Sequence, residues 1–380
     1  MKKEQIIKRI TAIVLATGMV FGTAACGSNG NNSGDSERKD AASIKEENQI
    51  AEKETEGVKE TAEHTGETSA KKTEYPLTIM TYGSDGSELK TTYEKAPEKV
   101  LAVYQGSIET MLALGLEDHL VATAGLDNEV MDEQKAAFSK TNYLDEFTPS
   151  IETVTMLEPD MIFSWGSLFK EKILGDAKGW VDKGVNTYMN TNTRPLQNAV
   201  SYNKTLDNEY NDILNLGKIF DVQDKAEAIV NDMKDTITKV EEKIVDIEEK
   251  PTALILESSK DSFTNYGATS LAGDMLTQLG GVLANPDATG TGKEDVIAAN
   301  PDVIFVVYMP YAGDDPEQVR QEKLNVILED EAYASLDAVK NGRVVPIMLS
   351  EMYASATRTK DGIVTFAKGL YPEIDLEFEE

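Results

Sequence analysis

The sequence has few of the side chains that form metal sites. Its 380 residues include one cysteine and two histidines. A single cysteine cannot form an intramolecular disulfide, and a bare zinc or manganese site needs several histidines together with carboxylates. His64 lies in a polar segment and His119 in a predicted turn. This composition argues against a site for a free divalent metal and against haem that is ligated by histidine.

Positive charge is also scarce. The 37 Lys and Arg residues are outnumbered by 67 Asp and Glu residues, which gives a net charge of −30. Nucleic acids and anionic membrane surfaces repel such an acidic protein, so we expect no nucleic-acid partner and no direct binding to a lipid surface. A simpler interpretation of the charge is that it keeps the protein soluble.

Residues 1–25 have the pattern of a signal peptide. A basic start that includes Lys2 and Lys3 precedes the apolar run 10–21, and small residues occupy positions 22–25. The apolar run is too short to span a membrane, and a small-residue exit is typical of a cleavage site. The pattern predicts that the protein is exported.

Cys26 directly follows the predicted cleavage site. A cysteine at this position resembles the acylation site of bacterial lipoproteins, although Thr23 departs from the aliphatic residue that is usual there. We expect lipidation of Cys26 and an anchor on the outer face of the cytoplasmic membrane, with ordinary secretion as the alternative. Residues 26–74 contain almost no large apolar side chain and predict a disordered acidic tether.

A repeat divides the remaining sequence. Residues 151–163 and 293–305 share Glu, Val, Pro-Asp, Ile and Phe at matching positions. Each copy predicts a short helix, a turn at Pro159-Asp160 or Pro301-Asp302, and a buried strand, because a β-branched apolar run after a turn is typical of a central parallel strand. The chain therefore contains two versions of one α/β unit.

A helix is predicted between the two copies, over residues 224–250. Its apolar residues recur at steps of three and four, and Pro251 follows it. The folded part is longer than one hydrophobic core usually supports. We therefore expect two Rossmann-like α/β lobes with mostly parallel sheets, at residues 75–223 and 251–380, joined by one long rigid helix. Parallel strands are expected at 100–104, 120–122, 161–165, 185–189, 252–257, 303–308 and 344–348.

These features together resemble the class of periplasmic binding proteins that deliver iron–siderophore complexes, haem or vitamin B12 to ABC importers. The resemblance covers residues 96 to about 373. It is carried by APEKV at 96–100, ETMLALG at 109–115, the two Pro-Asp units, the long helix, NGRVV at 341–345 and YPE at 371–373. It implies a class III binding-protein fold and a monomer that captures a ferric siderophore or a similar metal chelate for an ABC importer permease. A corrinoid or haem ligand is the alternative within this fold.

The resemblance assigns a role to two carboxylates. In the family, one Glu at the head of the helix before each Pro-Asp turn docks into arginines of the permease, and the matching residues are Glu152 and Glu294. A Glu in a first helical turn is favoured by the helix dipole and can pair with a guanidinium in a bidentate way. The alternative is that both residues only stabilise their own helix starts.

The ligand is expected between the lobes, at the carboxyl ends of the strands, where open parallel sheets bind their ligands. Aromatic side chains can stack on a planar chelate and arginines can hold its negative charge. Because arginine is scarce, a hydroxamate or mixed chelate is favoured over a tris-catecholate. A chelate brings its own metal, so we expect no metal site, cofactor or catalytic residue in the protein itself. The expected ligand-binding residues are Tyr104, Trp165, Arg194, Tyr266, Tyr308, Tyr311 and Arg358, and further strand-end residues include Glu257 and Tyr353.

The sequence leaves two other classes of protein open, an exported enzyme and a surface adhesin. For an exported enzyme, residues 290–293 partly match a phosphate-binding loop, but Asp287 occupies the position of its first glycine and Glu294 that of its Ser or Thr. Ser167 and Lys170 have the spacing of a serine acyltransferase pair but lack the companion motifs. A surface adhesin has no positive feature beyond the exported tether. Both remain alternatives to a binding protein.

Overall fold

The computed structural model describes residues 72–376 and 378. The predicted signal peptide, Cys26 and the predicted tether up to residue 71 lie outside the described residues. Among the helices in the described part, none has both the length and the apolar character needed to cross a membrane.

The N-terminal half contains a four-stranded sheet in the order β4-β3-β5-β6, and all of its strand pairs are parallel. The central strands β3 and β5 are buried along their whole length, which explains their continuous apolar sequences. A separate antiparallel hairpin, β1–β2, precedes the sheet. The bounds are β1 Leu77–Tyr82, β2 Glu88–Tyr93, β3 Val100–Val103, β4 Leu120–Ala124, β5 Met161–Ser164 and β6 Asn186–Met189.

The C-terminal half contains a six-stranded sheet in the order β10-β8-β7-β11-β12, with β9 paired to β7. The pairs β7–β11 and β11–β12 are parallel, whereas β8 pairs antiparallel with both β7 and β10. The sequence predicts the three parallel strands but not β8, β9 and β10, which are short. The bounds are β7 Thr252–Ser259, β8 Ser262–Asn265, β9 Val282–Leu283, β10 Gly290–Thr291, β11 Val303–Tyr308 and β12 Val344–Met348.

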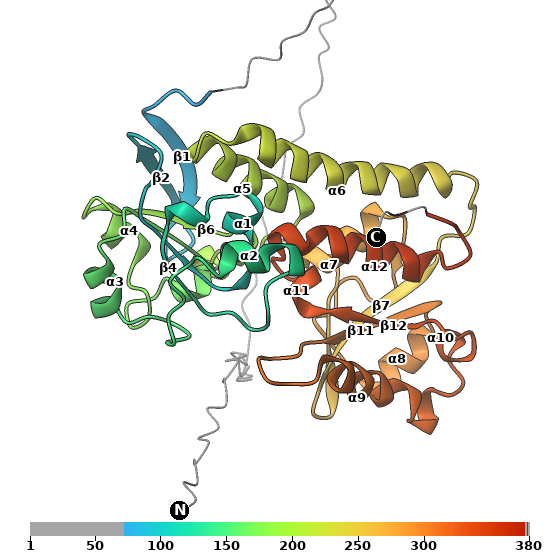
Figure 1. The fold of residues 1–380 in the computed structure, drawn as a ribbon. Coiled ribbons are helices and arrows are strands. Elements are labelled where there is room, and N and C mark those ends of the chain that lie inside the picture. The colour runs from blue at the N-terminus through green and yellow to red at the C-terminus, as the bar shows by residue number, and fades with distance from the viewer. Residues whose placement is uncertain (1–71, 377, 379–380) are drawn as a thin grey trace, which may run out of the picture. The chain divides into compact units, whose positions relative to one another are not determined.

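Helices alternate with the strands in both halves, and this arrangement confirms the predicted α/β class (Figure 1). The bounds in the N-terminal half are α1 Gln105–Ala113, α2 Lys135–Phe138, α3 Ile151–Leu157, α4 Ala177–Val181 and α5 Leu206–Ile219. The following helices are α6 Gln223–Lys243, α7 Leu271–Gln278, α8 Lys293–Ala299, α9 Pro316–Leu328, α10 Asp337–Lys340, α11 Leu349–Met352 and α12 Thr359–Leu370.

Helix α6 is the predicted helix between the two repeat copies, but it is shorter than predicted. It ends at Lys243, so residues 244–250 leave the helix well before Pro251. Its 21 residues span roughly 32 Å, because an α-helix rises about 1.5 Å per residue. Its apolar stripe, which includes Val230, Met233 and Val240, is buried as the spacing predicts, and the helix packs against α5 and α12.

The repeat has a structural cause. The Asp160 carboxylate accepts hydrogen bonds from the backbone N–H groups of Glu98 and Lys99, at 2.7 and 2.9 Å, directly before β3. The Asp302 carboxylate accepts one from the N–H of Thr252, at 2.7 Å, where β7 begins. Each aspartate therefore fixes the start of the neighbouring parallel strand, and the two copies do so in separate sheets.

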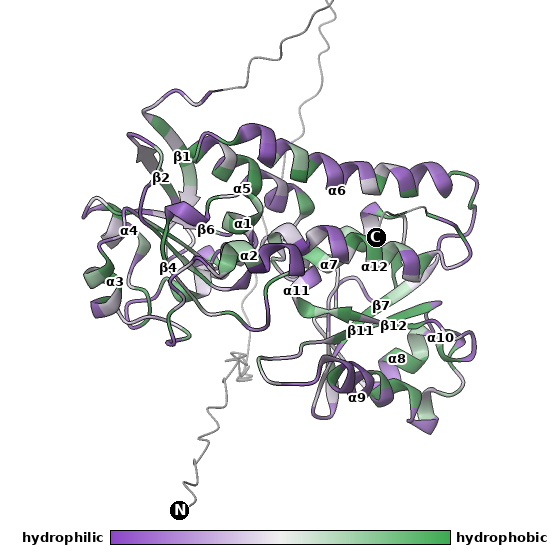
Figure 2. Cartoon of the chain, in the orientation of Figure 1, coloured by the Kyte–Doolittle hydropathy of each residue, from purple (hydrophilic) through white to green (hydrophobic). Residues whose placement is uncertain are grey.

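The hydrophobic core continues from one half to the other. A single cluster includes Val100 and Phe163 of the first sheet, Val230 of α6, and Ile255 and Phe305 of the second sheet. Two further clusters lie apart from it, one in each half. Figure 2 shows β7, β11 and β12 as hydrophobic strands, whereas hydrophilic residues recur along α6.

Candidate ligand-binding pocket

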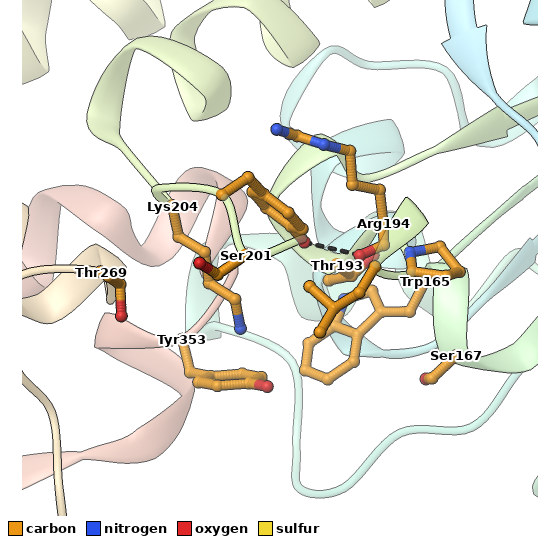
Figure 3. A pocket seen from close by; sticks show the side chains of 11 residues that line it. Trp165, Ser167, Thr193, Arg194, Ser201, Lys204, Thr269 and Tyr353 are labelled. Atoms are coloured by element: carbon orange, nitrogen blue, oxygen red, sulfur yellow. Dashed lines mark hydrogen bonds between the residues drawn. The ribbon is translucent and has the colours of Figure 1, made fainter. Parts of the chain in front are cut away.

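A pocket of about 430 Å³ is lined by residues from both halves of the chain (Figure 3). Trp165 follows β5 and Arg194 follows β6, so both lie beyond the carboxyl ends of parallel strands, where this kind of sheet binds ligands. Thr269 and Tyr353 come from the C-terminal half. The remaining lining residues are Ser167, Thr193, Pro195, Leu196, Ser201, Tyr202 and Lys204.

A hydrogen bond joins the loop after β5 to the loop after β6 beside the pocket. The Thr193 hydroxyl accepts a hydrogen bond from the N–H of Gly166 at 2.8 Å and donates one to the carbonyl of Asn190 at 2.7 Å. A Cβ atom at Gly166 would lie only 2.5 Å from the Thr193 carbonyl oxygen, so this approach requires glycine. These contacts of Thr193 and Gly166 hold the neighbouring residues Trp165 and Arg194 in place.

A series of aromatic rings crosses from one half to the other beside the pocket. Ring centroids are 4.0 Å apart for Tyr104 and Trp165, 5.8 Å for Trp165 and Tyr353, and 6.3 Å for Tyr353 and Tyr266. The structure thus brings together three aromatic residues that the sequence predicts as ligand-binding, Tyr104, Trp165 and Tyr266. Such rings offer flat apolar faces to a ligand.

Tyr104 has an unusual backbone conformation. Its φ angle is 85°, a region that bulky residues rarely adopt. The residue lies between β3 and α1, and its N–H donates to the carbonyl of Ala124 at 2.9 Å. Strained backbone of this kind persists where the surrounding structure fixes it, and it is common at functional sites.

The two cations that line the pocket differ in orientation. The guanidinium group of Arg194 lies 3.5 Å from the ring centroid of Tyr202 and 4.9 Å from that of Tyr82, and it points away from Tyr353 in Figure 3. The Lys204 amine lies 4.1 Å from the ring centroid of Tyr353. Arg194 therefore lines the pocket mainly with its stem, whereas Lys204 presents its charge there.

Arg358 does not line this pocket. Its guanidinium group is almost fully buried and donates to both carboxylate oxygens of Glu109, from Nε at 2.7 Å and from Nη2 at 2.5 Å. Nη2 also donates to the carbonyl of Glu129 at 2.9 Å. This geometry favours a structural role for Arg358 over the contact with ligand charge that the sequence predicts, because the charge is already neutralised.

Two further carboxylates, Glu209 and Asp212, are buried on α5 and accept hydrogen bonds from the loop after β6. Glu209 accepts hydrogen bonds from the Asn192 amide at 2.7 Å and from the backbone N–H of Ala356 at 2.8 Å. Burial raises the pKa of Glu209 to about 7, and the nearby charge of Asp212 adds to this effect. Burial also raises the pKa of Asp212 to about 6, although hydrogen bonds from Thr191 lower it in part. Glu209 thus connects α5 to the segment before α12.

The remaining predicted tyrosines lie in the C-terminal half. The Tyr266 hydroxyl donates to Glu257 at 2.5 Å. Tyr311 is half exposed, in the loop after β11, and burial together with the charges of Asp127 and Glu257 raises its pKa. Tyr308 is partly buried near Glu351 and makes no ring contact with the aromatic series in the described part of the chain.

The predicted docking residues Glu152 and Glu294 are both exposed, in the first turns of α3 and α8. Other side chains cap these helices. The Ser150 hydroxyl accepts from the N–H of Thr153 at 3.1 Å, and the Asp295 carboxylate accepts from the N–H of Gly292 at 3.0 Å. Neither glutamate is needed for capping, so both are available to a partner.

The described residues 72–376 and 378 contain no group of three or more His, Cys, Asp and Glu side chains placed to hold a metal ion. His119 contacts the carbonyl of Pro97 through Nδ1 at 2.6 Å and packs edge-on against Phe220. This histidine has a structural role, in agreement with the sequence-based expectation.

Sequence reasoning missed Lys204 and Glu209. Lys204 follows Tyr202 in a segment without a strand or helix signal, and its N–H donates to the carbonyl of Thr269 at 3.1 Å. Glu209 is an ordinary polar residue that no feature of the sequence singles out. Both residues are recognised only from their contacts with the C-terminal half in the folded structure, because no local sequence motif marks them.

Comparison with known proteins gives consistent results. A family model described as periplasmic binding protein matches residues 100–348. The crystal structure of a periplasmic binding protein from Veillonella parvula DSM 2008 is 30% identical, with a TM-score of 0.71, and the match covers 80% of this chain and 93% of that one.

Two curated proteins of Bacillus subtilis (strain 168) are also similar. The uncharacterized ABC transporter substrate-binding lipoprotein YvrC is 25% identical over 313 residues, and the match covers 79% of this chain and 87% of the relative. The petrobactin-binding protein YclQ is 23% identical over 279 residues, and the match covers 70% of this chain and 79% of the relative. Since the family model spans well over half of the chain, the protein belongs to the periplasmic binding protein family.

Proposed function

We propose that this protein captures a ferric siderophore, or a similar metal chelate, and delivers it to the permease of an ABC importer. The observation that carries the proposal is the pocket itself, which residues of both halves line at the carboxyl ends of β5 and β6. A chelate bound there contacts Trp165, Lys204 and Tyr353. The names of the relatives, one a substrate-binding lipoprotein and one petrobactin-binding, support the proposal.

The proposal includes a location and a mode of delivery. The protein is exported and held by a lipid on Cys26 at the outer face of the cytoplasmic membrane, and it acts as a monomer. The exposed Glu152 and Glu294, one on each half, pair with arginines of the permease. The protein is a transport component and not an enzyme, so the ligand leaves unchanged.

Aromatic stacking and a single pocket lysine suit an uncharged or weakly charged complex. A tris-catecholate complex carries considerable negative charge, and the pocket offers it only Lys204, because Arg194 stacks on tyrosines and Arg358 is paired with Glu109. A hydroxamate or mixed chelate therefore fits better. A corrinoid or haem is the alternative ligand.

Native mass spectrometry against a panel of ferric siderophores, haem and corrinoids tests the proposal. The expected result is one intact chelate per monomer, with quenching of Trp165 fluorescence and no change in the chelate after release. A Trp180→Phe variant separates the signal of Trp165 from that of the other tryptophan, which is buried in α4. Binding of no member of the panel, or release of an altered compound, contradicts the proposal.

A further inference from the structure

One buried carboxylate joins two segments that carry pocket residues. Arg194 belongs to the loop after β6, and Tyr353 lies between α11 and α12. Glu209 of α5 accepts a hydrogen bond from the Asn192 amide of that loop through Oε1, at 2.7 Å. Its Oε2 accepts one from the backbone N–H of Ala356, at 2.8 Å. Each carboxylate oxygen therefore holds one of the two segments.

The loop after β6 is firmly attached to α5. Asn192 is fully buried, and its amide also donates to the carbonyl of Thr205 at 2.9 Å. Its side-chain oxygen accepts from the N–H of Thr205 at 3.0 Å and from the Asn208 amide at 2.8 Å. These partners lie at the start of the helix that carries Glu209. The loop and α5 thus form one unit, to which Glu209 ties Ala356.

The segment that carries Tyr353 has an unusual backbone. Ala354 and Ala356 have φ angles of 49° and 50°, in the left-handed region that alanine rarely adopts. The Trp165 indole, whose ring contacts that of Tyr353, has no hydrogen-bond partner for its N–H among the described residues. Strained backbone persists only where surrounding contacts fix it. The conformation that places Tyr353 in the pocket therefore depends on contacts such as the one from Glu209.

Helix α1 supports the same segment at two other points. A Cβ atom at Gly106 would lie 3.2 Å from the Ala354 carbonyl oxygen, so the helix packs closely against the segment. Arg358, at the end of the segment, pairs with Glu109 of α1. The hydrogen bond at Ala356 lies between these contacts and ties the middle of the segment to α5.

Glu209 loses part of this role when it binds a proton. Both of its oxygens accept hydrogen bonds, so a proton on either one removes an acceptor. Burial and the charge of Asp212, on the same helix, raise the pKa of Glu209 to about 7, and Lys204 lowers it in part. The loop after β6 presents the uncharged Asn192 amide, and the charge of Arg358 is neutralised by a glutamate of α1. Glu209 therefore changes its charge near neutral pH.

We propose that Glu209 is a positioning residue for the ligand: its ionised form fixes Tyr353 in the pocket relative to the loop after β6, and protonation releases Tyr353. This inference rests on the proposed function, because the ligand is the chelate that the pocket holds. Glu209 does not line the pocket and acts through Ala356. Affinity for the chelate then falls as the solution becomes acidic.

Quenching of tryptophan fluorescence by acrylamide tests the positioning without any ligand. Trp180 is only 6% exposed, so in the wild-type protein the quencher mainly reaches Trp165. Release of Tyr353 opens the Trp165 indole to the quencher, because the two rings are in contact. The quenching constant of wild type is expected to be low at pH 8 and to rise in acid, with a midpoint where Glu209 titrates, at about pH 7. A quenching constant that does not change between pH 8 and pH 5.5 overturns the proposal.

Two variants assign the pH dependence to Glu209. Glu209→Gln accepts through one oxygen only, so its quenching constant is expected to be high and independent of pH. Asp207→Asn, exposed on the same helix, is the control and is expected to reproduce the wild-type curve. A wild-type curve in Glu209→Gln overturns the assignment. If Glu209→Gln fails to fold, the curve of the wild-type protein still tests the proposal.

Affinity for a ferric chelate is the second measurement. The probe is a neutral ferric trihydroxamate without an ionisable side group, so its own charge is the same at pH 5.5 and pH 8. Wild type is expected to bind it about tenfold more tightly at pH 8, since a hydrogen bond to a charged group contributes enough for that ratio. Glu209→Gln is expected to bind it equally at both pH values.

The outcomes separate the role of Glu209 from the function. Equal wild-type affinity at both pH values overturns the positioning role and leaves the proposed function intact. Binding of the probe at neither pH overturns the assignment to hydroxamate chelates, whereas the acrylamide curve, which needs no ligand, still supports or overturns the role of Glu209.

Discussion

Arg358 and Glu109 form a buried bidentate ion pair, with N–O distances of 2.5 and 2.7 Å, between the segment before α12 and helix α1. The two residues are far apart in the sequence, and together they join the N-terminal and C-terminal halves of the chain. A buried pair of this geometry is expensive to break, because removal of one partner leaves the other charge desolvated and unpaired.

Replacement of Glu109 with Gln is expected to lower the free energy of unfolding by about 3–5 kcal/mol. The measurement is urea denaturation followed by circular dichroism. A Glu98→Gln variant, which breaks the exposed pair between Lys95 and Glu98, is the control and is expected to change stability little. Stability of Glu109→Gln close to wild type would contradict the structural role and would return Arg358 to the predicted ligand contacts.

The pH dependence of stability is expected to report on Glu209. Its pKa in the folded protein, about 7, is above the ordinary value of 4.5, so the unfolded state releases its proton at lower pH than the folded state. The favourable contribution of Glu209 to the free energy of unfolding is therefore fully present below about pH 4.5 and is lost as pH rises towards 7. A Glu209→Gln variant lacks this loss, so its stability relative to wild type is expected to rise between pH 5 and 8.

Denaturation of both proteins at several pH values measures this difference. The Glu209→Gln variant loses one hydrogen bond, because its amide faces the Asn192 amide, but that loss is constant with pH. Asp207→Asn, on the same helix, is the control. Its free energy of unfolding is expected to vary with pH in the same way as that of wild type. Parallel curves for Glu209→Gln and wild type would show that Glu209 does not titrate in this range.

Lys204 is expected to contact the bound chelate. Lys204→Ala should weaken binding of the chelate identified by mass spectrometry about tenfold, since a charged donor to a ligand oxygen is lost. Lys183 provides a matched control, because its amine lies 5.0 Å from the ring of Trp180, away from the pocket. Titration of Trp165 fluorescence measures both variants, and equal affinity in Lys204→Ala and Lys183→Ala would exclude the contact.

Glu152 and Glu294 are expected to act only in delivery. Reversal of both to Arg should abolish uptake of the chelate by cells and leave the affinity of the purified protein unchanged, because both side chains are exposed and serve no cap. The control reverses Glu241 and Glu248, which are also exposed, and should retain uptake. Uptake that survives the Glu152 and Glu294 reversal would remove these residues from the proposed interface.

Local patterns predict much of the fold. The strands β11 and β12 have the predicted bounds, because β-branched runs mark them directly. The repeat is visible for a physical reason, since Asp160 and Asp302 each bond to the start of a neighbouring strand. The predicted end of α6 lies seven residues beyond the observed one, because residues 244–250 continue the apolar spacing after the helix has ended.

The residues of the candidate site were harder to predict from the sequence than the fold. Strand ends indicated Trp165 and Tyr104, since topology places such residues together. The partners of Arg358 and Glu209 depend on contacts between distant segments, which no spacing reveals. Lys204 belongs to a loop whose conformation follows from the hydrogen bond to Thr269, and the sequence gives no signal for that pairing.

The shared hydrophobic cluster has a consequence for how the protein unfolds. Because Phe163, Val230 and Phe305 belong to one continuous core, neither half can lose its packing without exposing apolar surface of the other. Heating should therefore melt residues 75–376 in a single cooperative transition, without a stable fragment that proteases could release from either side of α6.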